Sequence, residues 1–164
     1  MKRRALGLGV AAIAGAGIAW VLTAPLPVHA GRLEAIAAID GDAAAGETLF
    51  WAGGCASCHA APGAEGDVKL VMSGGVRLAS DFGTFIAPNI SPDPDAGIGA
   101  WSISDFANAM LAGVSPDGRH YYPAFPFTSY TRMTDRDIAD LFAFLKTLAP
   151  SPVASLPHEV GFPF

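Results

Sequence analysis

The chain contains two cysteines, and a histidine directly follows the second: Cys55, Cys58 and His59. Thiols at this spacing can each form a thioether with one vinyl group of a single porphyrin, and the histidine can then bind the iron. A zinc site would need more ligands, but there is no second cysteine pair and only three other histidines are present. A redox disulfide would be expected within a βαβ pattern, which the flanking sequence lacks. The motif therefore predicts one covalently attached haem c.

Haem is attached to such motifs outside the cytoplasm, and the N-terminus has the features of an export segment. Three basic residues at positions 2–4 precede an uncharged stretch over residues 5–24. This stretch is longer than the ~7–15 residues of a signal-peptide core and close to the ~20 residues that span a bilayer. Val28, His29 and Ala30 form a small-residue cleavage site. Residues 1–30 are thus predicted to be a signal peptide or, as the length favours, a membrane anchor with its linker.

Three amphipathic helices are predicted in the remainder of the chain. The first covers residues 43–52 and ends at two glycines; the second covers residues 103–112 behind a Ser102/Asp105 capping box. The third covers residues 135–148, starts at Thr134 and ends before two prolines. No alternating Val/Ile-rich run predicts an extended sheet. We expect an all-α fold of short helices and long loops around one haem, plus the N-terminal hydrophobic helix.

The region after the N-terminal segment is acidic. Residues 31–164 contain seven Lys/Arg and fifteen Asp/Glu, a formal charge of −8. This balance argues against nucleic acid as a partner. It suits docking to a basic patch on a redox partner, and it equally suits keeping an exported domain in solution.

Several segments together resemble one known family. The chain is similar to class I-type c cytochromes, in particular to the haem c subunits of bacterial periplasmic alcohol, aldehyde and gluconate dehydrogenases. The resemblance lies in Gly46-x-x-x-Phe50, the haem motif, and residues 87–93 (APNISPD), 97–102 (GIGAWS), 118–126 (GRHYYPAFP) and 130–135 (YTRMTD).

The resemblance implies a cytochrome c domain over residues 42–149, preceded by a linker at 31–41 and followed by a Pro-rich tail at 150–164. It also implies that the first and last helices cross at a Gly/aromatic contact. Gly46 and Phe50 would there meet three residues of the last helix, Leu141, Phe144 and Leu145. Many relatives continue into a second haem domain, so this chain is expected to be either a single-haem member or a piece of a two-haem protein.

The second axial ligand of the iron decides what the haem does, because a thioether there raises the reduction potential and closes the iron to small molecules. The family supplies this ligand from the loop before the last helix, where this chain has Met133. Met133 is our first choice, although its place before Thr134 also suits a hydrophobic staple. Met72, Met110 and His120 remain as alternatives. The family often has Met at the position of Phe125, which cannot bind iron.

Four other residues are candidate haem contacts. The Pro88 carbonyl can accept a hydrogen bond from the second nitrogen of His59 and so orient the ring. Arg119, Tyr122 and Trp101 can hold the haem propionates by charge and hydrogen bonds. Each also has an ordinary structural explanation, as a loop proline, a surface arginine or a core aromatic.

These observations predict an electron carrier rather than an enzyme. The chain would take electrons from an exported dehydrogenase and pass them to a further haem protein, a quinone site or an oxidase. It would lie on the periplasmic side of the bacterial inner membrane. The alternative is a haem peroxidase or a ligand-binding haem sensor, and either would need an open position at the iron.

Overall fold

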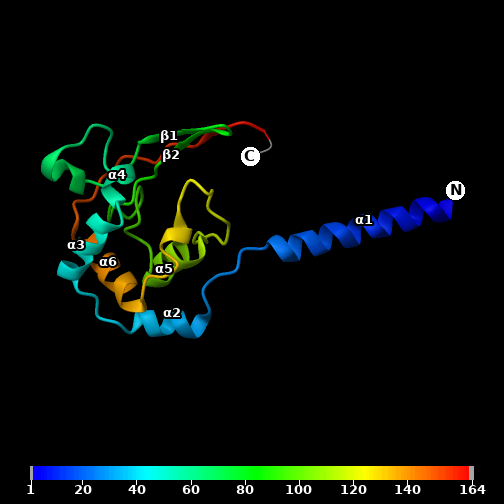
Figure 1. The fold of residues 1–164 in the computed structure, drawn as a ribbon, viewed down its shortest axis with the longest axis horizontal. Helices are drawn as coiled ribbons and strands as arrows, with labels where there is room; N and C mark the ends of the chain where they lie inside the picture. The colour runs from blue at the N-terminus through cyan, green and yellow to red at the C-terminus, as the bar shows by residue number, and fades with distance from the viewer. Residues whose placement is uncertain (1, 163–164) are drawn as a thin grey trace.

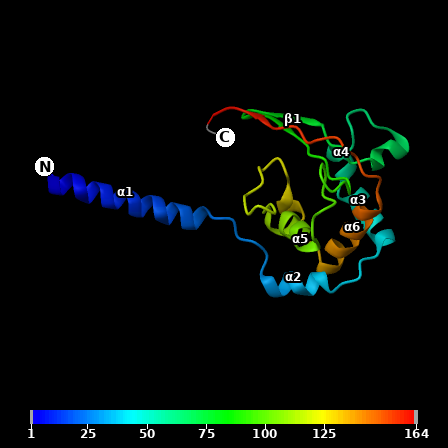
Figure 2. The same cartoon turned by 180° about the vertical axis from the view of Figure 1, so that it is seen from behind.

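The computed structural model describes residues 2–162 of the chain, with side chains described from residue 13 onward. The elements follow in the order α1 (Lys2–Thr23), α2 (Ala30–Ala37), α3 (Ala43–Ala52), α4 (Cys55–His59), η1 (Gly66–Leu70), β1 (Arg77–Ser80), β2 (Gly83–Ile86), α5 (Ile103–Ala112), η2 (Phe127–Ser129), α6 (Asp135–Thr147) and β3 (Glu159–Val160). In Figures 1 and 2, α2 to α6 form a folded body, and α1 projects away from it.

The crossing of α3 and α6 organises this body. A Cβ atom at Gly46 would lie 2.0 Å from the backbone oxygen of Asp140, so only glycine lets the two helices approach this closely. Phe50, one turn further along α3, is fully buried, and its ring lies 5.2 Å from that of Phe144 on α6. The predicted Gly/aromatic contact is confirmed. It fixes the end of α3, from which the chain turns into the haem motif.

The three predicted helices begin and end close to the expected residues because their signals are local. Ser102 and Asp105 form the predicted capping box of α5, and Thr134 and Asp137 form a second one at α6. Helix α6 ends at Thr147, one residue earlier than predicted. Each capping box pairs backbone N–H groups that the first helical turn would otherwise leave without a partner.

The expected short helices and loops are present, but the expectation that no sheet would form is wrong. Strands β1 and β2 pair antiparallel, with Arg77 opposite Ile86, and β3 adds to β2 with Gly83 opposite Val160. A Cβ atom at Gly83 would lie 2.3 Å from the Glu159 oxygen, so the glycine allows β3 to approach. Strands of four, four and two residues are too short to produce the alternation that marks a strand in sequence.

Two segments that we expected to be a linker and a tail pack against the folded body over the residues that the structure describes. Most of the predicted linker at residues 31–41 belongs to α2, whose Ile36 is fully buried in the core. The segment before α2 is held by Val28, whose N–H donates to Asn108 Oδ1 at 2.8 Å. The described part of the predicted tail, up to residue 162, runs back along the hairpin of β1 and β2 (Figure 1).

The N-terminal segment forms α1, but among the described residues no helix is long and apolar enough to cross a bilayer. The interpretation of residues 5–24 as an anchor rests partly on the side chains of residues 5–12, which lie outside the described ones.

Candidate haem site

The haem motif forms a short helix that starts at a sharp turn. Gly53 caps the end of α3, and Gly54 adopts a left-handed conformation with φ 71° before α4 begins at Cys55. Glycine takes this conformation at no steric cost. Cys55 and Cys58 are unpaired and partly buried on α4. Two consecutive glycines therefore place both thiols on one short helix directly behind α3.

His59 is held by two hydrogen bonds to neighbouring loops. Its Nδ1 lies 2.8 Å from the Pro88 carbonyl oxygen, and its own backbone oxygen accepts from Gly74 N–H at 2.7 Å. A carbonyl oxygen only accepts, so Nδ1 carries the proton and Nε2 presents a lone pair. Within the described part of the chain, Nε2 has no hydrogen-bond partner. Burial lowers the pKa of His59, and the bond to Pro88 opposes this shift. The ring is thus oriented as a neutral metal ligand.

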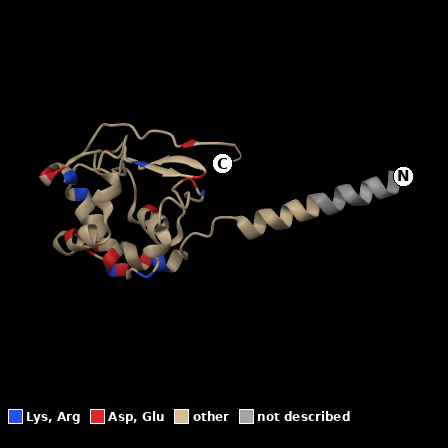
Figure 3. Cartoon of the chain, turned by 45° about the horizontal axis from the view of Figure 1, so that its top comes forward, with Lys and Arg blue, Asp and Glu red and all other residues tan. Residues whose placement is uncertain are grey.

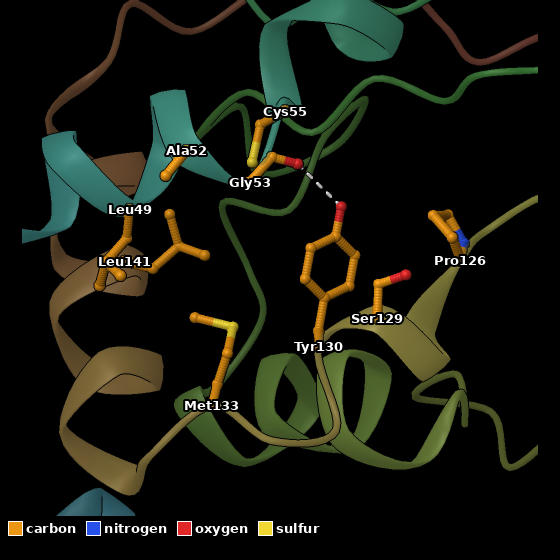
Figure 4. Close-up of a pocket in the computed structure, with 9 residues that line it drawn as sticks. All are labelled: Leu49, Ala52, Gly53, Cys55, Pro126, Ser129, Tyr130, Met133 and Leu141. Carbon is orange, nitrogen blue, oxygen red and sulfur yellow. Dashed lines mark hydrogen bonds between the residues drawn. The ribbon is translucent and has the colours of Figure 1, made fainter.

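A cavity of about 430 Å³ lies beside the motif (Figure 4), within the ~300–1,000 Å³ typical of ligand pockets. Its lining is mostly apolar and comes from α3, α4, the loop around η2, and α6: Leu49, Ala52, Gly53, Cys55, Pro126, Ser129, Tyr130, Met133 and Leu141. The thiol of Cys55 and the thioether of Met133 both point into this space (Figure 4). Burial raises the pKa of the Cys55 thiol to about 11.

Tyr130 ties the two sides of the cavity together. Its hydroxyl donates to the Gly53 carbonyl oxygen at 3.0 Å, and burial raises the pKa of the phenol. The bond joins the loop before α6 to the turn before α4 across 77 positions of sequence. The ring therefore orders the wall between Cys55 and Met133 (Figure 4).

The structure distinguishes the four candidates for the second iron ligand by their positions. Met133 lines the cavity, whereas Met72 and Met110 are buried in the hydrophobic core, with 0% and 6% of their surface exposed. His120 lies in a loop, where its Nε2 is 3.0 Å from the Thr23 carbonyl oxygen. Of these four candidates only Met133 reaches the cavity that Cys55 also lines.

The other predicted haem contacts do not line this cavity. Arg119 is largely exposed and pairs with Asp117, its Nε 2.6 Å from the carboxylate. Tyr122 packs against Phe85 and His158, and Trp101 packs against the core. Pro88 does not line the cavity, but its predicted hydrogen bond to His59 is present.

Sequence reasoning missed several lining residues. Leu49, Pro126 and Ser129 carry no chemical signal, because apolar and small residues look alike in a core and in a haem pocket. Tyr130 stands three positions before Met133, and this neighbourhood was the available signal. The acceptor of its hydroxyl is a backbone carbonyl, and because every residue has one, the sequence could not identify this partner.

These residues fit a covalently bound haem. Two thiols on one short helix suit the two vinyl groups, the free Nε2 of His59 suits the iron, and a thioether and apolar walls suit the rest of the group. The site fits haem iron by its donor atoms, because a soft thioether and a neutral imidazole bind haem iron, whereas a cluster of carboxylates would suit a hard cation.

Comparison with known proteins agrees with this fit. The cytochrome c family profile matches residues 43–149, and the chain belongs to this family of electron-transfer proteins. A diheme cytochrome c-type protein of Cereibacter sphaeroides is 54% identical over 164 residues, which cover 99% of this chain and 54% of that protein. The cytochrome subunit of fructose dehydrogenase from Gluconobacter japonicus and the cytochrome c subunit of gluconate 2-dehydrogenase from Pantoea cypripedii are each 36% identical.

Those alignments cover 73% and 72% of this chain, and 24% and 26% of the two relatives. This chain therefore spans about half the length of the diheme relative and about a quarter of the dehydrogenase subunits. The resemblance to haem c subunits of bacterial dehydrogenases is confirmed.

Proposed function

We propose that this chain carries single electrons on one covalently bound haem, from an exported dehydrogenase to a component of a respiratory chain. The relatives that are cytochrome subunits of fructose and gluconate dehydrogenases support the kind of donor. The single pair of cysteines in the sequence supports a count of one haem in this chain. The acceptor would be a further haem protein, a quinone site or an oxidase. The chain itself performs no substrate chemistry in this proposal.

The observation that carries the proposal is the cavity that Cys55 and Met133 share, together with the oriented ring of His59 on the same short helix as Cys55. Bound in this way, a haem supplies a one-electron iron couple. The residues would supply the rest: Cys55 and Cys58 would hold the group, and His59 and Met133 would be the two protein donors to its iron. With both donors supplied by the protein, no position would stay open for peroxide or for a small ligand.

We further propose that the folded body lies on the periplasmic side of the inner membrane. Covalent attachment to this motif outside the cytoplasm and the basic, then uncharged, N-terminus support this location. The mass of the purified protein distinguishes a retained segment 1–30 from a cleaved one. Recovery of the haem protein in the cytoplasmic fraction would contradict the location.

Visible spectra of the oxidised and reduced haem protein test the axial pair. We expect Met133→Ala to lose the weak long-wavelength sulfur-to-iron band that marks a thioether ligand and to become high-spin. Met110→Leu is the matched control, since it removes a buried thioether of similar volume from the core on α5 and should keep the band.

A band that survives Met133→Ala would overturn the assignment of Met133. A high-spin iron in the unmodified protein would overturn the closed electron carrier and favour the peroxidase or sensor alternative.

A further inference from the structure

Residues that follow the matched family region make buried contacts with the loop that orients His59. We call residues 151–160 the C-terminal strap; the family match ends at residue 149. In Figure 1 the strap passes behind α4 and then follows the β1/β2 hairpin. Ser151, at its start, is 5% exposed, although the residues that follow it are mostly exposed. A surface segment that is anchored by a buried polar contact is held in a fixed position.

The anchor of the strap is Asn89. Its amide nitrogen donates to the carbonyl oxygens of Ser151 and Val153, both at 2.8 Å, and its backbone N–H donates to Ser155 Oγ at 3.0 Å. Its side-chain oxygen accepts from the Ser91 N–H at 2.8 Å. Asn89 is 3% exposed, so losing these partners would leave buried polar groups unpaired.

Asn89 directly follows Pro88, whose carbonyl oxygen accepts the hydrogen bond of His59. The peptide group that contains this carbonyl also contains the Asn89 N–H, which donates to Ser155. One rigid peptide plane therefore connects the ring of His59 on one side to the strap on the other. A displacement of the strap would strain or remove the Asn89–Ser155 bond, which holds the plane that carries the acceptor of the His59 proton.

The far end of the strap is fixed as well. His158 Nδ1 accepts from the Ile86 N–H at 3.1 Å, β3 pairs with β2, and Arg77 forms an ion pair with Glu159. The strap is thus bonded to Asn89 near its start and to β2 near its end. The loop that precedes Asn89 is also held by Gly75, whose N–H donates to the Ala87 oxygen at 2.9 Å.

We propose that the strap is a positioning element for the haem ligand His59, with Asn89 and Ser155 as its positioning residues, and that it sets the reduction potential of the haem. This inference rests on the proposed function, because it takes His59 as the iron ligand. The Pro88 carbonyl draws on the Nδ1 proton and makes the imidazole a stronger donor, which favours the oxidised iron. Loosening the strap weakens this bond, so the potential rises.

The test compares four variants of the haem-loaded full chain. Ser155→Ala removes the acceptor of the Asn89 N–H, Ser155→Thr keeps a hydroxyl there, and Asn89→Ala removes both side-chain donors. Ser115→Ala is the matched control, since Ser115 Oγ also accepts a backbone N–H, from Arg119 at 3.1 Å, and makes all its hydrogen bonds within residues 115–119. The readouts are the midpoint potential and the NMR exchange rate of the His59 Nδ1 proton.

We expect a positive shift of the potential and several-fold faster proton exchange in Ser155→Ala, and larger changes in Asn89→Ala. Ser155→Thr and Ser115→Ala should match the unmodified protein. If Asn89→Ala fails to fold, Ser155→Ala still decides the question. Equal potentials and exchange rates in Ser155→Ala and Ser115→Ala would overturn the strap proposal while the low-spin spectrum, and with it the proposed function, stands. Loss of that spectrum in the unmodified protein would overturn both.

Discussion

The side chains around the cavity divide into those that bear the chemistry and those that hold its walls. Cys55 and Met133 present sulfur to the cavity, while Tyr130 spans the two segments that carry them. The hydroxyl of Tyr130 is satisfied by a backbone oxygen of Gly53 rather than by a side chain. Its role is therefore to keep the loop before α6 close to the haem motif.

Replacing Tyr130 by Phe should cost about 1 kcal/mol of unfolding free energy, because it leaves the Gly53 oxygen without this donor but keeps the ring. Denaturant unfolding of the haem protein measures the loss. Tyr122→Phe is the control: no hydrogen bond of the described residues uses its hydroxyl, and the change should stay within about 0.5 kcal/mol. Equal stability of the two variants would show that the Tyr130 bond contributes nothing.

The packing of α3 on α6 places the haem motif. Gly46 brings the two backbones together, and Phe50 and Phe144 fill the space beside the crossing. Because α4 follows α3 after only two glycines, any shift of α3 would move Cys55 relative to Met133 at the start of α6. The crossing thus sets the width of the cavity as well as part of the core.

Gly46→Ala should destabilise the fold by about 3 kcal/mol or more, since the new methyl group meets a helix backbone that cannot yield. Gly31→Ala is the matched control, because the helical Gly31 has only the His29 side chain nearby, at 3.5 Å. Thermal unfolding of both variants checks the prediction. A small effect of Gly46→Ala would mean that α3 and α6 can separate without loss of the core.

The net charge of the protein affects how fast it meets charged partners. Acidic residues lie on several helices and loops of the body rather than on one element (Figure 3). The formal charge of −8 over residues 31–164 produces a negative field that steers cationic partners toward the protein.

Reduction by a small cationic reagent should slow as salt is added, and reduction by an anionic reagent should become faster, because salt screens the field over a length of about 10 Å at 0.1 M. Stopped-flow kinetics at several ionic strengths measure both rates. The same salt dependence for both reagents would show that charge does not guide access to the haem, leaving solubility as the effect of the acidity.

The haem motif, the three helices and their caps could be read from the sequence, since each depends on residues within a few positions of one another. Ser102 with Asp105 and Thr134 with Asp137 are three positions apart, and so are the two cysteines. The family resemblance extended this local information to the α3/α6 contact. It also directed attention to Met133 among the four methionines.

The addition of β3 to the sheet, the partner of Tyr130 and the strap depended on tertiary structure, because each joins groups that are far apart in the chain. Asn89 meets Ser151 across 62 positions, and its partners there are carbonyl oxygens that every residue type carries. The burial of Met72 and Met110 in the core and the exposure of Arg119 in its loop also appear only in the tertiary structure. Residue types and spacings determined which chemistry the chain can perform, and long-range backbone contacts decided which side chains take part in it.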